Sequence, residues 1–561
     1  MTATAEEREE RRRELERRLA GLSPTKRALL ERGALGAMTR STVGGAATIT
    51  RRPPDSPAPM SFAQELVWVL ERTNPGSTYN LSRLARIRGG LDCDALQRSV
   101  DALVARHEIL RTTFAVVDGE PRQLIQEPRP VPIDRIDLRA MPESERDPEI
   151  IRRARVLMAR PFNLAVDLQL RTTLFQLHAD DHVLLLESHH IATDGWSRSI
   201  LLRELTLLYD GFHSGKPVEL PALAIQYADF AVWQRSYLRG EALERELAYW
   251  RRQLAGAPAR LELPTDRPRP MGPSFAGAKR TAWLPPALLE RLRHLSQEHG
   301  VTLYMTLLAA FDVLLARYSG ETEILVGSPI AGRLHPETHG VMGFFTNTLV
   351  MRTSLEGDPS VPELLRRVRD VCLGAHDHQE VPFEKLVFEL QREHGGRTPL
   401  LQATFTLHDP EPDTLQISGV TVVPVGVPSP ATKFDLSLFT EESSRGLRTS
   451  MEYRTDLFDG ETVERMLGHY RTLLESLVRA SDQPVSRLAM LPPGEYSMVM
   501  GSGTDGALRY PTDKLVSDLV AEQATRTPDA IAIETDDGGV RLTYAELERQ
   551  SNQLAWELRR M

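Results

Sequence analysis

Apolar positions along the chain follow two different spacings, which predict a mixture of helices and buried strands. The segment "DCDALQRSVDALVARH" places Leu96, Val100 and Leu103 on one helical face. "HVLLLES" is a short apolar run between charged and turn residues, and it predicts a buried strand. "SRSILLRELTLLYDGF" then resumes the helical spacing. Two adjacent histidines, His189 and His190, therefore lie where a central strand ends and the chain turns toward a helix.

A second set of elements follows the proline-rich stretch at 263–273. "PPALLERLRHLSQEHG" begins with prolines and ends at Gly300, which predicts a well-delimited helix. "TLYMTLLAAFDVLLARYSG" is apolar on most sides and predicts a buried helix, and "EILVGSPI" predicts a strand. Further helices are expected around 362–378 and 460–479. Mixed strands and helices in two successive halves predict an α/β or α+β protein with two similar lobes.

The two ends of the chain differ from this pattern. Residues 1–36 predict a helical segment rich in Glu and Arg, either a solvated helix or a docking element for another polypeptide. Residues 37–57 are Gly-rich and then Pro-rich, which indicates a linker. Residues 486–512 indicate a second linker. Residues 513–561 predict a helix, two strands and a helix, and the pattern stops as though a further domain had been cut short.

Composition narrows the class of protein. A chain of 561 residues predicts two or three folded units, and 41% hydrophobic with 26% charged residues is typical of a soluble globular protein. The net charge of −9 gives no general attraction to nucleic acid, and no apolar run reaches the ~20 residues that span a bilayer. The charged N-terminus is not a secretory signal. Two distant cysteines, Cys93 and Cys372, favour a reducing cytoplasm over a disulfide framework.

The residues after the predicted strand offer a choice of chemistry. A neutral imidazole can accept a proton or a hydrogen bond near neutral pH. Because neighbouring strand residues point to opposite faces, only one of His189 and His190 can face a given cleft. Asp194 can cap the following helix, orient a histidine or pair with a distant arginine. Gly195 indicates a tight backbone conformation or a close approach of substrate.

These four residues alone leave several interpretations open. Paired histidines at a strand end are often structural, and histidine with aspartate can also bind zinc or iron. The metal interpretation is weakened because adjacent strand histidines diverge and the sequence offers no evident third ligand.

The order of the surrounding motifs adds a family resemblance. The pattern HHxxxDG, formed by His189, His190, Asp194 and Gly195, resembles the signature of the condensation domains of non-ribosomal peptide synthetases. Other segments resemble the remaining motifs of that family in the same order: "SFAQELVW", "RHEILRTTF", "YADFAVWQ", "MGFFTNTLVMR", "HQEVPFEKLV" and "GRTPLLQATFTL". The first of these departs from the family pattern at Glu65 and Val67. The resemblance covers about 58–485, and "LTYAEL" within 513–561 resembles the start of an adenylation domain.

The resemblance implies a fold and a set of partners. The family fold has two lobes of the chloramphenicol-acetyltransferase type, arranged in a V around a central tunnel, and here the lobes would be 58–235 and 236–485. An upstream donor and a downstream acceptor peptidyl carrier protein would dock at the tunnel mouths. Their phosphopantetheine arms would carry the substrates, and the rest of an adenylation domain would be a further partner. The chain itself would bind no cofactor or metal, and nucleic acid and membrane are not expected partners. The location would be cytoplasmic.

The resemblance also assigns roles to residues. His190 would face the tunnel as the catalytic histidine, together with Gly195. His189, Asp194 and Arg333 would be structural, with Arg333 of "GSPIAGR" pairing Asp194 across the lobes. Three further residues are expected in the tunnel or at the lobe junction: Trp196, Ser328 and Asn347.

The implied reaction is attack of an acceptor α-amine on a donor thioester, which forms a peptide bond. Whether His190 acts as a base or as a positioning group is left open by the sequence. Two alternatives remain: an epimerization domain of the same fold, and a non-catalytic recruitment domain. The "VPFE", "YADFAVW" and "DGWS" segments favour condensation, and recruitment relatives tend to lose the second histidine, which is present here as His190.

Overall fold

The structure is a computed structural model that describes residues 48–53, 56–73, 76–258, 260–270, 275–393, 401–408, 415–426, 432–479, 482–502, 514–535 and 541–561. It divides into two compact units, Met1–Leu491 and Pro492–Met561, and each is described by itself. The predicted helical segment 1–36 lies outside the described residues.

The first lobe of the larger unit is built on a six-stranded sheet with the order β12-β13-β2-β7-β6-β5. All neighbours in it are antiparallel except β5 and β6. Its central strand β7 contains the apolar run "VLLL", because both of its faces are covered by helices. The strands are β2 (Asn80–Gly89), β5 (Ile133–Asp137), β6 (Leu170–Gln176), β7 (Asp181–His189), β12 (Leu415–Ile417) and β13 (Val420–Val425).

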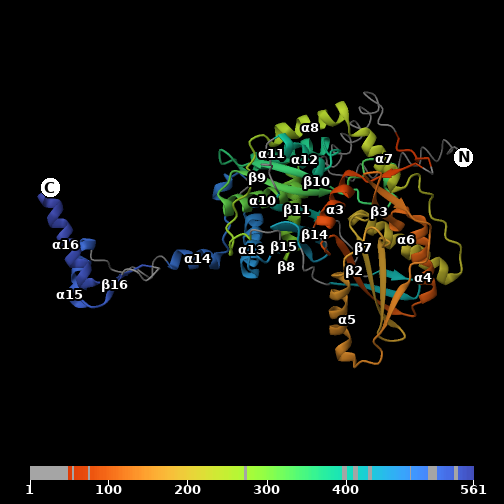
Figure 1. The fold of residues 1–561 in the computed structure, drawn as a ribbon, viewed down its shortest axis with the longest axis horizontal. Helices are drawn as coiled ribbons and strands as arrows, with labels where there is room; N and C mark the ends of the chain where they lie inside the picture. The colour runs from red at the N-terminus through yellow and green to blue at the C-terminus, as the bar shows by residue number, and fades with distance from the viewer. Residues whose placement is uncertain are drawn as a thin grey trace. The chain divides into compact units, whose positions relative to one another are not determined.

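Helices cover both faces of this sheet. Leu184 on β7 packs in the cluster that includes residues of α4 and α6, whereas its neighbours Val183 and Leu185 pack in the cluster that includes residues of α5. Figure 1 shows α5 on one side of this sheet and α4 and α6 on the other. A small antiparallel sheet, β1-β4-β3, lies in the same lobe. These elements are α3 (Phe62–Thr73), α4 (Cys93–Arg106), α5 (Glu143–Met158), α6 (Gly195–Ser214), α7 (Tyr227–Tyr237), β1 (Ala58–Pro59), β3 (Thr112–Val117) and β4 (Glu120–Ile125).

The second lobe has a six-stranded sheet of its own, with the order β10-β9-β11-β14-β15-β8. Strand β11 runs parallel to β9 and β14, and the other pairs are antiparallel. The strands are β8 (Gly277–Leu284), β9 (Glu323–Ile330), β10 (Asn347–Ser354), β11 (Ala403–His408), β14 (Leu436–Ser443) and β15 (Gly446–Arg454).

One helix of the second lobe is buried over most of its length, as its sequence predicts: α10, in which every residue from Met305 to Leu315 is buried. It ends at Gly320, whose positive φ of 75° closes the helix in a left-handed conformation. The helices of this lobe are α8 (Gly240–Leu254), α9 (Pro286–Glu298), α10 (Leu303–Ser319), α11 (Val361–Asp377), α12 (Phe383–Glu393) and α13 (Gly460–Leu477).

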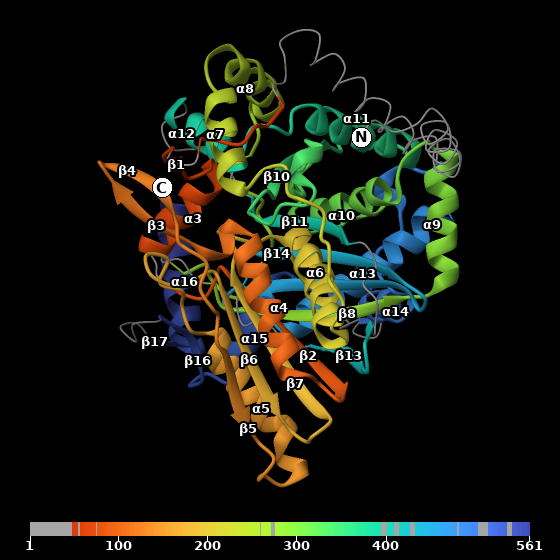
Figure 2. The same cartoon turned by 90° about the vertical axis from the view of Figure 1, so that its right-hand side faces the viewer.

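Two segments of the second half cross into the first lobe. The hairpin β12–β13 pairs with β2, and Figure 2 shows β13 beside that strand. The loop 331–346 between β9 and β10 buries Val341, Met342, Phe344 and Phe345 in the core of the first lobe. The mixed, two-lobed fold class is confirmed, but the range 236–485 does not hold the second lobe alone, because β13 adds its edge to the first sheet.

The predicted linkers contain ordered segments. Residues 48–53 of the first linker pack on the first lobe, where Ile49 is 2% exposed and Arg52 forms an ion pair with Asp229 at 3.2 Å. These residues of the predicted linker therefore contact the first lobe, because the Ile49 side chain is inserted into its core. Within 486–512, residues Pro493–Ser502 form helix α14.

After α14, the described residues from 514 to 561 of the smaller unit follow the predicted order of helix, strand, strand and helix. Its two strands pair antiparallel and irregularly. The elements are α15 (Val516–Arg526), β16 (Ile531–Glu534), β17 (Arg541–Thr543) and α16 (Tyr544–Arg560). Across the described ranges, no single helix has the length and apolar character needed to cross a membrane, and only the bent pair α9 and α10, at 102°, meets that test jointly.

Candidate active site

A short turn joins the end of β7 to the start of α6. The backbone N–H of His190 donates to the Tyr79 carbonyl at 2.8 Å, and the Thr193 hydroxyl donates to the His189 carbonyl at 3.1 Å. Asp194 then caps α6, because its Oδ1 accepts the Ser197 N–H at 2.7 Å. The sequence "HHIATDGWS" therefore folds locally into a strand end, a tight turn and a capped helix.

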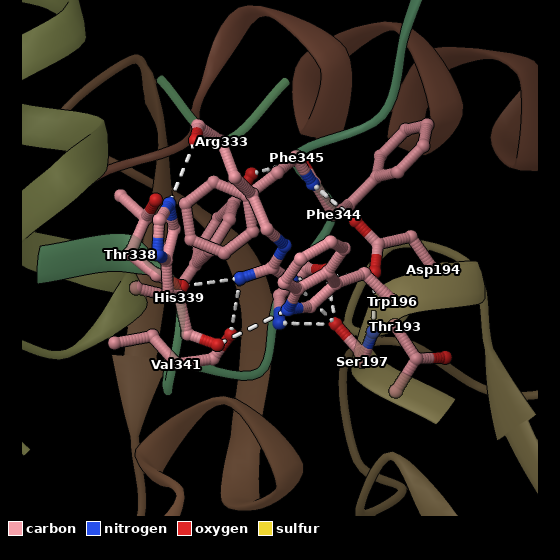
Figure 3. A network of polar contacts seen from close by, with 12 residues as sticks. Thr193, Asp194, Trp196, Ser197, Arg333, Thr338, His339, Val341, Phe344 and Phe345 are labelled. Atoms are coloured by element: carbon pink, nitrogen blue, oxygen red, sulfur yellow. Dashed lines mark hydrogen bonds and ion pairs between the residues drawn. The ribbon is translucent and has the colours of Figure 1, made fainter. Parts of the chain in front are cut away.

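The Asp194 carboxylate also binds the loop that crosses from the second lobe. Nη2 of Arg333 lies 3.3 Å from Oδ1, and the backbone N–H of Phe345 donates to Oδ2 at 3.0 Å (Figure 3). Both side chains of the pair are buried. The predicted pairing of Asp194 with Arg333 is thus present in the structure, and it fastens loop 331–346 to the first turn of α6.

Ser197 and Arg333 extend this network, which Figure 3 shows from close by. The Ser197 hydroxyl accepts from Arg333 Nη2 at 3.0 Å and donates to the Gly343 carbonyl at 2.8 Å. Nη1 of Arg333 donates to the carbonyls of Val341, at 2.7 Å, and Thr338. Burial lowers the pKa of Arg333, while the charge of Asp194 acts in the opposite direction. The Asp194–Arg333–Ser197 cluster is thus almost fully paired.

Other motif residues brace the same loop. The Tyr227 hydroxyl donates to the Phe344 carbonyl at 2.6 Å and is 2.8 Å from the hydroxyl of Ser61. At Gly343, an added Cβ would lie 1.8 Å from the Tyr227 ring, so only glycine permits this approach. The first, fourth and fifth motifs of the sequence therefore meet beside the HHxxxDG turn.

His189 is packed into the protein. Its side chain is 1% exposed, its Nδ1 accepts the Ile191 N–H at 3.2 Å, and its ring centroid lies 5.8 Å from that of Phe162. Nε2 is 3.5 Å from a carboxylate oxygen of Glu71, longer than a good hydrogen bond. Burial lowers the pKa of His189, and the Glu71 carboxylate only partly opposes this shift. The ring is therefore neutral and its surroundings give it a structural role.

His190 has a different environment. Its side chain keeps part of its surface accessible, and its ring centroid is 4.5 Å from that of Phe344. Burial lowers the pKa of His190 well below its usual value, and the positive charge of Lys433 acts in the same direction. Nδ1 is inaccessible and forms no hydrogen bond within the described part of the chain, although backbone groups of His190 and Thr193 favour the charged ring. We therefore assign Nε2 as the atom through which a neutral His190 can accept a hydrogen bond or a proton.

Gly195 and Trp196 occupy the first turn of α6. Gly195 does not have a positive φ, and an added Cβ would meet no heavy atom within 4 Å. The interpretation of Gly195 as a tight backbone position is therefore wrong, and what the structure offers there is open space. Trp196 is 45% exposed, and its Nε1 donates to the His339 carbonyl at 3.1 Å, which places it at the lobe junction.

Ser328 and Asn347 lie further along the second lobe. Ser328 is buried on β9, where its hydroxyl accepts from Tyr304 at 2.6 Å, so its contact is internal to that lobe. Nδ2 of Asn347 donates to the carbonyls of Gln379, at 2.9 Å, and Val381, at 2.8 Å. Asn347 also lines a small cavity of about 50 Å³ between α7 and the start of β10. Asn347 thus joins the fifth and sixth motifs rather than contacting His190.

Sequence reasoning missed one charged residue near the histidines, Lys433. Lys433 Nζ lies 4.3 Å from the ring centroid of Tyr79, and its charge acts on both His189 and His190. Burial lowers the pKa of Lys433 to about 8. A single lysine in "ATKFDLSLF" carries no motif that could have revealed it, because its position depends on the fold of the second lobe.

The composition of the site bears on metal binding. Across the described residues, no group of three or more His, Cys, Asp and Glu side chains is arranged to hold a metal ion. The groups that the site does supply are the neutral imidazole of His190 and the nearby ammonium of Lys433.

Comparison with known proteins assigns the family. The sequence profile described as "Condensation domain" matches residues 56–500, which is most of the chain. The chain belongs to the condensation-domain family. This condensation domain is 43% identical over 507 residues to one of the linear gramicidin synthase proteins of Brevibacillus parabrevis, covering 90% of this chain and 6% of that protein. It is 37% identical over 553 residues to phosphinothricin tripeptide synthetase PhsC of Streptomyces viridochromogenes, covering 97% of this chain and 50% of the relative.

Solved structures agree with this fold. The condensation domain superposes on a holo four-domain nonribosomal peptide synthetase with a TM-score of 0.73 and 21% identity, covering 92% of this chain and 40% of the other. It also resembles the X-domain of teicoplanin biosynthesis in complex with OxyB, with a TM-score of 0.72 and 26% identity, covering 80% and 99%. The chain spans half or less of the length of the curated relatives described above, which are multidomain synthetase proteins.

Proposed function

We propose that this condensation domain joins a donor acyl or peptidyl thioester to the α-amine of an acceptor aminoacyl thioester. The observation that carries the proposal is His190, which is neutral and partly accessible beside a turn held by the buried Asp194–Arg333 pair. Because the ring is already neutral, such a histidine can accept a hydrogen bond or a proton from an amine without first losing a proton itself.

The proposed reaction forms one bond, breaks one bond and moves one proton. The acceptor nitrogen forms a bond to the donor carbonyl carbon, and the carbon–sulfur bond of the thioester breaks. One amine proton moves to His190 Nε2 or to the departing thiolate, and the longer thioester stays on the acceptor. Because an α-amine loses its proton near pH 8 unaided, positioning can supply up to about 7–11 kcal/mol of the acceleration. A base at His190 would add roughly two to four powers of ten.

The partners belong to the same proposal. An upstream donor carrier and a downstream acceptor carrier would present the substrates on phosphopantetheine, in the cytoplasm, and an adenylation domain would follow this domain. The likeness of the smaller unit to the start of an adenylation domain rests on "LTYAEL".

Two alternatives would give different products. An epimerization domain would racemise a carrier-bound residue without acyl transfer. A recruitment domain would only bind another protein, and the teicoplanin X-domain, which this chain resembles, has been solved in a complex with OxyB.

The decisive experiment loads a donor and an acceptor carrier with a panel of acyl and aminoacyl pantetheine groups and adds the domain. We expect the coupled product on the acceptor carrier by intact mass spectrometry, and no product when the donor carrier is omitted. Racemised residue without coupling would support epimerization instead. Carrier-independent binding of a partner protein with no product across the panel would support recruitment.

A further inference from the structure

Lys433 lies on a firmly held segment just before β14. The Thr432 N–H donates to the Phe275 carbonyl at 2.8 Å. Asp435 accepts from Arg269 Nη1 at 3.1 Å and lies 3.5 Å from Arg454. Since anchors flank it on both sides, the Lys433 backbone is fixed relative to the second-lobe sheet.

From that segment the Lys433 side chain reaches across to the first lobe. Its Nζ lies 4.3 Å from the centroid of the Tyr79 ring, a distance typical of a cation–π contact. The carbonyl of the same Tyr79 accepts the backbone N–H of His190 at 2.8 Å. One residue therefore separates the ammonium from the backbone of the candidate catalytic histidine.

The surroundings of Lys433 combine accessibility with burial. Much of its side-chain surface is accessible, yet burial among protein atoms lowers the pKa of Lys433 to about 8. His190 is likewise partly accessible, although burial dominates its pKa. Tyr79 links the two groups, because its ring contacts Lys433 and its carbonyl accepts the His190 N–H. We call the space bounded by His190, Tyr79 and Lys433 the His190 recess.

The charges around the His190 recess leave the ammonium free to donate. Glu71 on α3 and Glu384 on α12 favour its charged form, but within the described residues no carboxylate forms an ion pair with Nζ. Glu71 is directed at His189, and burial raises the pKa of Glu384. At the N-terminus of α6, Asp194 is already paired with Arg333. An ammonium has three N–H donors and no acceptor, so a ligand oxygen in the recess would find an unoccupied donor.

We propose that Lys433 is a second catalytic residue, whose ammonium donates a hydrogen bond to the carbonyl oxygen of the donor thioester in the His190 recess. This inference rests on the proposed function. As the acceptor nitrogen bonds to the carbonyl carbon, the oxygen gains negative charge, and a fixed cation stabilises that charge more than it stabilises the neutral carbonyl. The ammonium keeps its proton throughout. The carbon–sulfur bond breaks when the oxygen re-forms its double bond.

The competing explanation is that Lys433 only ties the two lobes together through Tyr79. The two explanations differ in what changes when the ammonium loses its charge. Because a cation–π tie also needs that charge, its loss above about pH 8 would lower the thermal stability of the parent together with the rate. A donor to the reacting oxygen would lower the rate whenever the ammonium loses its proton, while the fold stays intact.

The test compares Lys433→Met, Lys433→Arg and the control Lys385→Met in single-turnover coupling with both carriers loaded. Lys385 lies on α12 and pairs with Glu389 at 2.7 Å. We expect Lys433→Met to slow coupling by about 10²–10³-fold, the usual cost of one such donor, and Lys433→Arg to retain most of the rate. The parent rate should fall above about pH 8, and this fall should be absent in Lys433→Arg, whose charge persists.

Two controls separate the outcomes. Thioester hydrolysis at high pH affects all variants equally, so the ratio of Arg variant to parent at each pH isolates the lysine. If Lys433→Met does not fold, the pH profiles of the parent and of Lys433→Arg still test whether the ammonium acts in coupling. A parent-like rate in folded Lys433→Met, or an unchanged pH profile in Lys433→Arg, would overturn the inference while leaving the proposed function standing. Absence of any product with the parent would instead overturn the proposed function.

Discussion

The two sides of the HHxxxDG turn contrast in how their polar groups are used. On one side, Asp194, Ser197 and Arg333 are buried and bind one another or backbone groups at 2.7–3.3 Å. On the other side, His190 and Lys433 keep accessible surface and have few partners. Since buried polar groups in folded proteins are normally paired, the first side holds the geometry and the second is available to a ligand.

The contrast extends to the two neighbouring histidines. Strand alternation directs His189 toward Phe162 and Glu71, and His190 toward Phe344 and the recess. The two neighbouring histidines thus belong to different sides of the turn, His189 to the structural side and His190 to the reactive side. The substitutions below test whether the two sides can be separated.

The largest loss of stability is expected for Arg333→Ala. It leaves the Asp194 carboxylate buried without its cation, which typically costs about 3–5 kcal/mol. Urea unfolding should show this loss together with reduced coupling. The control Arg152→Ala breaks an exposed pair with Glu149 and should leave the unfolding midpoint almost unchanged. A parent-like midpoint for Arg333→Ala would mean that the backbone N–H groups alone hold Asp194.

Whether the sequence could predict a contact of this site depends on how far apart the contacting residues lie along the chain. The pairing of Asp194 with Arg333 and the capping of α6 were predicted, because capping is local and the family motif supplies the partner. The insertion of β13 beside β2 and the approach of Lys433 to Tyr79 were not, because both join segments over 300 residues apart. The tight-backbone role of Gly195 failed because the turn before it needs no positive φ there.

The second largest loss of stability is expected for His189→Ala. It removes a buried ring from its contact with Phe162 and leaves the Ile191 N–H without its acceptor, which together cost about 2–4 kcal/mol. Thermal unfolding should show the loss. His294→Ala changes an exposed ring on α9 and serves as the control. Parent-like stability in His189→Ala would remove the distinction between the two histidines.

Ser197→Ala should have a smaller effect of about 1–3 kcal/mol. It leaves the Gly343 N–H, which donates to the Ser197 hydroxyl at 3.0 Å, buried without a partner. Ser199→Ala on the exposed side of the same helix is the matched control. Equal denaturant midpoints for the two variants would show that the Ser197 hydroxyl does not fasten the loop.

The smallest effect concerns acid stability at His190. Its folded pKa is below the unfolded value of about 6.5, so the unfolded state binds more protons below that pH, and stability falls as the pH decreases. We expect His190→Ala to remove up to about 1.4 kcal/mol of this loss per pH unit below 6.5. Unfolding at pH 5.0 and 7.0 measures the difference. Identical pH dependence in parent and variant would indicate that His190 titrates normally.

The most direct test of the account is the single-turnover coupling rate of His190→Ala, measured with both carriers loaded and with carrier binding checked separately. The account predicts parent-like thermal stability at neutral pH and carrier affinity, with a rate about 10²–10⁴-fold lower. His190→Gln should keep partial activity if the residue only positions the amine, and none beyond that of Ala if it removes the proton. A near-parental rate in His190→Ala would contradict the assignment of the reactive side.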